Sequence, residues 1–274
     1  MKAQLIFKTV FLVCTISLVT ISCNKKSETM IREETVTYKI DTTIFKGFAA
    51  YPDDPSVKYP AILIVHEWWG LNDYAKNRAR QLAKAGYVAF AVDMFGNGKI
   101  AADPGQAQEY TGPFYKDPHL ALTYLDAALK EIKKIKQTDV NDVAAIGYCF
   151  GGYIVLNAAK LGADLKGVVS FHGGLKGVVP DKKLLKAKIL VCHGGSDKFV
   201  TMQDVDTFKH QMDSIKADYT FNVYPNSTHA FTNPEATKIG KKFNLPIEYN
   251  AKEDTASWND MMAFFNKIFE KKQN

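Results

Sequence analysis

Apolar and polar positions divide most of the chain into strands and helices that follow one another. Two stretches with strict alternation come first, Thr35–Ile40 and Thr43–Ala50, and Asp41 and Thr42 separate them. This pattern is typical of an antiparallel hairpin at the edge of a sheet. The continuous apolar run Ala61–Val65 then predicts a strand that is covered on both faces.

Beyond that run, strand and helix patterns repeat in turn. The predicted strands are Tyr87–Val92, Val143–Ile146, Gly167–Phe171, Lys188–Val191 and Tyr219–Tyr224. The predicted helices are Asn72–Ala85, Asp117–Ile135, Phe150–Leu161, Met202–Ile215 and Thr255–Phe269. Alternation of this kind predicts an α/β fold with a mostly parallel, doubly wound sheet.

One connection is much longer than the others. It runs from Asp93 to Asp117 and contains several glycines and prolines together with Tyr110, Phe114 and Tyr115. Loops of this length in a compact domain are usually functional or disordered. The aromatic side chains favour a lid or the wall of a pocket.

The first residues differ in kind from the rest. A basic start precedes an apolar stretch from Leu5 to Ile21, and the small residue Ser22 precedes Cys23. Such a stretch is typical of an export signal, and Ser22-Cys23 resembles the site at which bacterial lipoproteins are cleaved and lipidated. We therefore expect residues 1–22 to be the signal, Cys23 to be lipidated, and residues 23–34 to be a flexible tether. The protein would then be exported and held by its lipid on the periplasmic side of a bacterial membrane; plain secretion and a retained anchor are the alternatives.

Composition agrees with one globular domain over residues 35–274. The chain has 274 residues, of which 46% are hydrophobic, so it can bury a sizeable core. Its formal charge of +6 comes from lysines that alternate with acids, which is typical of a solvated surface and not of a nucleic-acid partner. No phosphate loop, dinucleotide fingerprint or metal-ligand spacing is present, so we expect no cofactor and no metal.

The segment Gly147–Gly152 carries the clearest chemical signal. It joins an apolar strand pattern to a helix of small residues, so Cys149 lies where a buried strand turns abruptly into a buried helix. This is the pattern of a nucleophile elbow, in which the central residue adopts a strained conformation with positive φ and the flanking glycines prevent collisions. A helix N-terminus beneath the sulfur favours the thiolate. The alternative is a core cysteine beside a glycine-rich turn.

A thiol nucleophile needs a base and a group that orients the base. Asp197 directly follows the strand Lys188–Val191, and His229 directly follows the strand Tyr219–Tyr224. The order nucleophile, acid, histidine is that of the α/β-hydrolases. Successive parallel strands bring their carboxyl ends to one edge of the sheet, so the three residues are predicted to meet there.

The oxyanion hole is expected from two backbone amides. One is that of Phe150, directly after the nucleophile, and the other lies near Trp68 in the loop after the third strand. Glu67 precedes Trp68 and places a carboxylate at the mouth of the pocket, where acyl transfer does not require negative charge. A salt bridge or a turn hydrogen bond is the structural explanation of Glu67.

These segments together resemble the dienelactone hydrolase family of α/β-hydrolases over most of residues 35–270. The resemblance rests on His66–Gly70, on Gly147–Gly152, and on the segments around Asp197 and His229. It implies that Cys149 is the nucleophile, that His229 is the general base and acid, and that Asp197 orients His229. It also implies that Glu67 takes the proton of the cysteine when substrate arrives.

The chain departs from the family pattern at one place. The resemblance implies an arginine pair that clamps a substrate carboxylate, with one arginine four residues after the histidine, where this chain has Asn233. The sequence therefore predicts hydrolysis of a small ester, lactone or thioester through a cysteinyl intermediate, with a dienelactone carboxylate disfavoured. A catalytically silent binding lipoprotein on the same fold and a carboxylesterase of broad specificity are the competing interpretations.

Overall fold

The computed structural model describes residues 30–269. The predicted export signal and the predicted lipidation site, Cys23, lie outside this part of the chain. Within residues 30–269, no helix combines the length and the apolar character that crossing a membrane requires.

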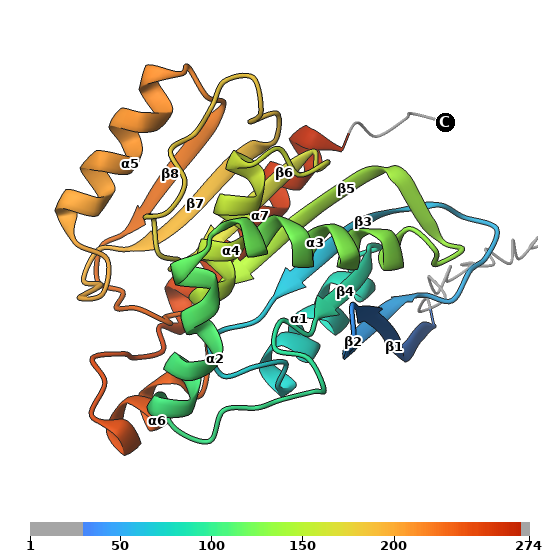
Figure 1. Ribbon diagram of the computed structural model, residues 1–274, viewed down its shortest axis with the longest axis horizontal. Helices are drawn as coiled ribbons and strands as arrows, with labels where there is room; N and C mark the ends of the chain where they lie inside the picture. Colours follow the sequence, from blue (N-terminus) through green and yellow to red (C-terminus); the bar gives the residue numbers. More distant parts are fainter. Residues whose placement is uncertain (1–29, 270–274) are drawn as a thin grey trace, which may run out of the picture.

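The described residues form one eight-stranded sheet in the order β1-β2-β4-β3-β5-β6-β7-β8 (Figure 1). Strands β3 to β8 are parallel to one another, whereas β2 is antiparallel to both β1 and β4. The bounds of the strands are β1 Ile31–Ile40, β2 Thr43–Pro52, β3 Tyr59–Val65, β4 Val88–Val92, β5 Thr138–Tyr148, β6 Gly167–Phe171, β7 Lys188–Gly194 and β8 Tyr219–Tyr224. The predicted α/β fold, with a mostly parallel sheet and an antiparallel edge hairpin, is confirmed.

The hairpin corrects one predicted boundary. Strand β1 begins at Ile31, and its first residues pair with the end of β2, Ile31 opposite Pro52 and Glu34 opposite Ala49. Residues 31–34, which were assigned to a flexible tether, therefore belong to the sheet. The polar sequence of this segment concealed the strand because β1 lies at the edge of the sheet, where half of its residues are exposed to solvent.

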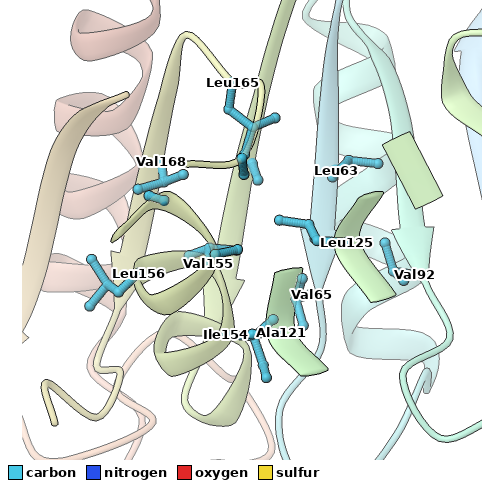
Figure 2. Close-up of a cluster of buried hydrophobic side chains, with 14 of the residues drawn as sticks. Leu63, Val65, Val92, Ala121, Leu125, Ile154, Val155, Leu156, Leu165 and Val168 are labelled. Carbon is cyan, nitrogen blue, oxygen red and sulfur yellow. The ribbon is translucent and has the colours of Figure 1, made fainter. Parts of the chain in front are cut away.

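The described residues contain seven helices. Their bounds are α1 Asp73–Lys84, α2 Pro104–Lys116, α3 His119–Ile132, α4 Phe150–Lys160, α5 Met202–Ser214, α6 Ala236–Phe243 and α7 Ala251–Ile268. Helices α1 and α7 contribute to the apolar cluster on one face of the sheet, and α3, α4 and α5 contribute to the cluster on the other. Figure 2 shows part of the second cluster, where Leu125 of α3 and Ile154 of α4 pack against Leu63 and Val65 of β3.

Two helices were not predicted. The long connection contains α2, whose first turn is capped by Asp103 through a hydrogen bond from the backbone of Gln106 (3.0 Å). Gly105, Gly112 and Pro113 lie inside α2, and their low helix propensity hid it from the sequence pattern. Helix α6 has only eight residues, too few for a clear periodic signal. The two helices meet in a small apolar cluster with Trp69, at the end of the molecule where Figure 1 places them.

Candidate active site

The elbow at Cys149 has the conformation that its sequence predicts. Cys149 has φ 55° and ψ −113°, a left-handed conformation that costs a non-glycine residue on the order of 1–3 kcal/mol. A side chain at Gly147 would collide with the carbonyl of Gly151, and one at Gly151 would collide with the carbonyl of Val65. Strand β5, helix α4 and strand β3 thus approach so closely that only glycine fits at these two positions.

The structure brings His229 and Asp197 together. Their hydrogen bond joins His229 Nδ1 and Asp197 Oδ2 at 2.8 Å. The other carboxylate oxygen of Asp197 accepts from the backbone of Phe199 (2.7 Å) and Val200 (3.2 Å). Burial alone would raise the pKa of Asp197, but the hydrogen bond and charge of His229 and these amides lower it. Asp197 is therefore held as a carboxylate that can orient the imidazole.

Cys149 lies on the other side of His229. Burial alone would lower the pKa of His229, but its electrostatic interactions and hydrogen bonds with Cys149 and Asp197 raise it well above its usual range. The arrangement thus favours a proton on the imidazole. The second free thiol, Cys192, is buried inside β7, and burial raises its pKa to about 12. Of the two thiols, Cys149 is the one that lines the cavity and contacts a base.

His172 supports this site from behind the elbow. Its Nδ1 accepts a hydrogen bond from the backbone of Cys149 (3.1 Å), and its Nε2 bonds to Thr232 Oγ1 (2.7 Å). Burial and the charge of His229 hold the pKa of His172 well below its usual range, so the ring is neutral and fixes the elbow from behind. The signal that could have found it is position, because His172 follows β6 as directly as Asp197 follows β7.

The amides of Trp68 and Phe150 are free to form an oxyanion hole. Phe150 is the first residue of α4, so its N–H has no acceptor within the helix. The carbonyl of Glu67 accepts hydrogen bonds from His66 Nδ1 and from the backbone of Gly70. In a trans peptide the C=O and the next N–H point in opposite directions, so this bonding turns the N–H of Trp68 away from His66.

His66 is locked as a neutral imidazole. Its Nε2 accepts from the backbone of Met94 (3.2 Å), which leaves the proton on Nδ1 for the Glu67 carbonyl. Burial lowers the pKa of His66 to about 4, so this tautomer persists across the neutral range. His66 therefore fixes the peptide that carries the amide of Trp68.

Glu67 is buried at the inner wall of the cavity, 3% exposed. Its Oε2 accepts a hydrogen bond of 2.6 Å from Asn233 Nδ2, so its partner is a neutral amide and not the cation of a salt bridge. Burial raises its pKa to about 7, against smaller opposing effects of Asn233 and of the charges of His229 and Arg78. A carboxyl with this pKa exchanges a proton near neutral pH.

Arg78 holds the loop that carries His229 and Asn233. Its Nη2 donates to the carbonyl of Thr232 (2.8 Å) and forms an ion pair with Asp254. The guanidinium lies over three aromatic rings, those of Tyr74, Tyr148 and Trp258. Arg78 lies on α1, outside the long connection that lines the cavity, and it does not line the cavity itself. It supports the site from behind.

These groups surround a cavity of about 580 Å³. Aromatic rings of Trp68, Trp69, Tyr115, Phe150, Tyr153 and Phe199 form much of its wall. Helix α2 contributes Pro104, Gln108, Thr111 and Tyr115, so the long connection lines a pocket as predicted. Its charged or titratable lining side chains, besides Cys149 and Tyr residues, are Glu67, His229, Lys176 and Asp204, and no arginine is among them.

In residues 30–269, no group of three His, Cys, Asp or Glu side chains is arranged to hold a metal ion. The site is thus described by its protein groups: a thiol at an elbow, a histidine with an orienting carboxylate, two free amides and one buried carboxyl.

The mostly parallel sheet, with an elbow after β5 and an acid and a histidine after β7 and β8, defines an α/β-hydrolase. The chain belongs to the dienelactone hydrolase family, whose model matches residues 45–269. It is thus a hydrolase of the dienelactone hydrolase type.

Individual relatives agree with this assignment. A protein of Yersinia pestis that is provisionally named a carboxymethylenebutenolidase is 25% identical over 232 residues, which cover 81% of this chain and 83% of the relative. The crystal structure of a dienelactone hydrolase-like promiscuous phosphotriesterase, P91, from metagenomic libraries has a TM-score of 0.82 and 31% identity and covers 87% of this chain and 98% of that one. A dienelactone hydrolase-like structure from Klebsiella pneumoniae, at 21% identity and a TM-score of 0.73, shares the fold.

The raised pKa of Glu67 predicts a pH-dependent effect on stability. A carboxyl whose pKa rises from 4.5 to about 7 on folding destabilises the fold once it ionises, so the cost is absent below about pH 4.5 and complete above about pH 7. At roughly 1.4 kcal/mol per pH unit, it reaches about 3 kcal/mol. We expect Glu67→Gln to raise the melting temperature at pH 8 and to change it little at pH 5, as measured by calorimetry.

The control is Glu109→Gln, which changes an exposed carboxyl on α2. It should leave the difference between the two pH values unchanged. An equal effect of Glu67→Gln at pH 5 and pH 8 would contradict the raised pKa.

Proposed function

We propose that this protein hydrolyses a carboxylic ester, lactone or thioester of a small molecule through a thioester on Cys149. The observation that supports this most directly is the strained elbow at Cys149 beside His229, which Asp197 holds at 2.8 Å. A strained nucleophile position is costly, and a protein that only captured a ligand would gain nothing from it. This argues against the silent binding lipoprotein.

In the proposed reaction the sulfur of Cys149 attacks the carbonyl carbon of the substrate. The negative charge that develops on the carbonyl oxygen is stabilised by the amides of Trp68 and Phe150. The intermediate then collapses to a thioester, and the alcohol leaves with a proton from His229. Water, deprotonated by His229, attacks the thioester and restores the thiol as the acid product departs.

Glu67 is the proposed acceptor of the Cys149 proton when substrate enters. A pKa of about 7 suits a base that works near neutral pH. In this structure its Oε2 accepts a hydrogen bond from Asn233, so Oε1 is the oxygen that would take the proton. The raised pKa of His229 supports the alternative, in which His229 alone activates the thiol.

The charge of the cavity favours uncharged substrates. No arginine lines it, and Lys176 is already paired with Asp204 at 3.2 Å. Asn233, at the position where the family resemblance implied an arginine, is bonded to Glu67 and offers no positive charge. A substrate carboxylate would lie near the carboxyl of Glu67, with no arginine and no unpaired lysine in the lining to offset the cost of its burial.

The preference of the cavity for uncharged substrates also favours a second candidate activity. The P91 structure, 31% identical to this chain, is that of a promiscuous phosphotriesterase. A phosphate triester carries no charge, and its aryl groups could pack among the aromatic rings of the cavity. We propose uncharged phosphate triesters as secondary substrates, as part of a broad esterase specificity.

Loss of the nucleophile or the base should abolish turnover. Cys149→Ala and His229→Ala should each lower kcat on 4-nitrophenyl butyrate by about 10³-fold or more. The residues of a triad act as a unit, so the loss of one member removes most of the rate enhancement that they provide together. Mass spectrometry of the wild type during turnover should find the added acyl group on the peptide that contains Cys149.

Cys192→Ala removes the buried thiol and serves as the control, with turnover close to that of wild type. An acyl group on another residue, or normal turnover of a folded Cys149→Ala variant, would exclude the cysteinyl intermediate.

Substrate charge should govern specificity. We expect kcat/KM for a 4-nitrophenyl ester with an anionic acyl chain, such as the hemisuccinate, to be at least about tenfold below that for the butyrate, because an unpaired buried carboxylate costs more than the ~1.4 kcal/mol that corresponds to tenfold. Asn233→Arg should bring the kcat/KM for the hemisuccinate closer to that for the butyrate. Equal rates on the two esters in the wild type would show that the missing arginine does not set specificity.

We also propose that the protein is exported and anchored by a lipid on Cys23, on the sequence argument alone. Native protein should then partition into detergent and carry a lipid mass on its N-terminal peptide, since buried acyl chains contribute ~0.8 kcal/mol per CH₂. Cys23→Ser should release the protein or leave it unprocessed. Soluble native protein with an unmodified N-terminus would indicate secretion without an anchor.

A further inference from the structure

A second cavity adjoins the candidate active site. It measures about 350 Å³ and is lined by Leu175, Lys176, Gly177, Gln203, Asp204, Thr207, Phe208 and Gln211. Leu175, Lys176 and Asp204 also line the cavity that contains Cys149. The two spaces therefore share one wall, and the Lys176–Asp204 ion pair lies on it.

The backbone of this shared wall is fixed from inside the fold. The fully buried Asn157 of α4 donates to the carbonyl of Lys176 (3.3 Å) and accepts from the backbone of Val178 (2.7 Å). Between them, Gly177 has φ +121°, and a side chain there would collide with the amide of Asn157. Helix α4 begins at the elbow, so one rigid element holds both the nucleophile and the wall of the second cavity.

The other side of the second cavity is one face of α5, the helix that also carries Asp204. Gln203, Thr207 and Gln211 are spaced four residues apart and thus lie in a row along the helix. Their side chains make no hydrogen bond to another residue within the part of the chain that the structure describes. Amide and hydroxyl groups both donate and accept hydrogen bonds, so this row can bind a hydroxyl group of a ligand either as donor or as acceptor.

Charge in the second cavity is balanced. Lys176 and Asp204 neutralise each other at 3.2 Å, and Leu175 and Phe208 supply apolar surface. An uncharged group with several hydroxyls fits this combination better than an anion or a purely apolar chain, because it can use the polar row without burying an unpaired charge.

The position of His229 indicates which part of a substrate would extend there. A general acid protonates the leaving oxygen, so the alcohol of an ester must lie beside His229. Phe199 packs against His229, with 5.0 Å between ring centroids, and the segment from Asp197 leads directly into α5. One short segment thus links the partner of His229 to the α5 side of the second cavity, and His229 and Asp204 both line the cavity that contains Cys149.

We propose that the second cavity is the subsite for the alcohol part of the substrate and that it takes a polyhydroxylated, sugar-like alcohol. The acyl part would lie among the aromatic rings of Trp68, Tyr115 and Phe150. This proposal rests on the proposed ester hydrolysis and names its substrate class: an ester between an aromatic or apolar acid and a sugar.

The test compares two esters of one acid, methyl 4-hydroxycinnamate and the glucose ester of 4-hydroxycinnamic acid. Wild type should show the higher kcat/KM on the glucose ester. The double variant Gln203→Ala with Gln211→Ala should lose roughly fivefold on that ester for each hydrogen bond removed. Its kcat/KM on the methyl ester should stay within about twofold of wild type, which separates loss of the subsite from loss of the reaction.

Asp206→Ala is the matched control, since Asp206 is exposed on α5 and lines neither cavity. It should behave as wild type on both esters. Equal kcat/KM of the wild type on the two esters, or equal losses on both in the double variant, would overturn the subsite.

A binding measurement keeps the subsite testable even if neither ester is hydrolysed. Titration calorimetry with a Cys149→Ala background should show tighter binding of the glucose ester than of the methyl ester, and the double variant should remove the difference. Equal affinities would overturn the subsite. Failure to hydrolyse the methyl ester, with the binding difference intact, would instead count against the proposed reaction alone.

Discussion

Steric crowding where β5 turns into α4 is the constraint on which the site depends. Gly147 and Gly151 approach neighbouring backbone so closely that a Cβ atom at either position would overlap it, and this closeness forces Cys149 into its left-handed conformation. The same turn presents the amide of Phe150 at the start of the helix and brings the elbow against the carboxyl end of β3. Cys149, the amide of Phe150 and the loop of Glu67 are thus positioned by one packing contact.

Near this turn, the hydrogen-bond partners of two histidines shift their pKa values in opposite directions. His229 faces the carboxylate of Asp197 and the sulfur of Cys149, and these raise its pKa in spite of burial. His172, whose ring lies 5.3 Å from that of His229, faces a backbone amide and a hydroxyl, and burial beside a positive neighbour keeps it neutral. Burial is common to both, so the hydrogen-bond partners decide which imidazole can move a proton.

The sequence predicted what local pattern and chain order determine. The elbow, the parallel strands β3 to β8, and the proximity of Asp197 to His229 follow from apolar runs and from the rule that parallel strands end at one edge. The contact between Asn233 and Glu67 did not follow, because 166 positions separate the two residues and only the folded sheet joins them. Helix α2 was hidden for another reason: its glycines and proline oppose helix formation, and packing against Trp69 and Phe150 stabilises it.

Much of the cavity wall and the proposed catalytic residues come from different parts of the fold. Cys149, Asp197 and His229 follow strands of the central sheet, whereas α2, α5 and the segment after β6 supply much of the lining. Changes in these peripheral segments can alter the shape and polarity of the cavity without moving the backbone that holds the thiol and the imidazole. Such a division lets descendants of one ancestor acquire new substrates by small steps while the bond-breaking apparatus is inherited intact.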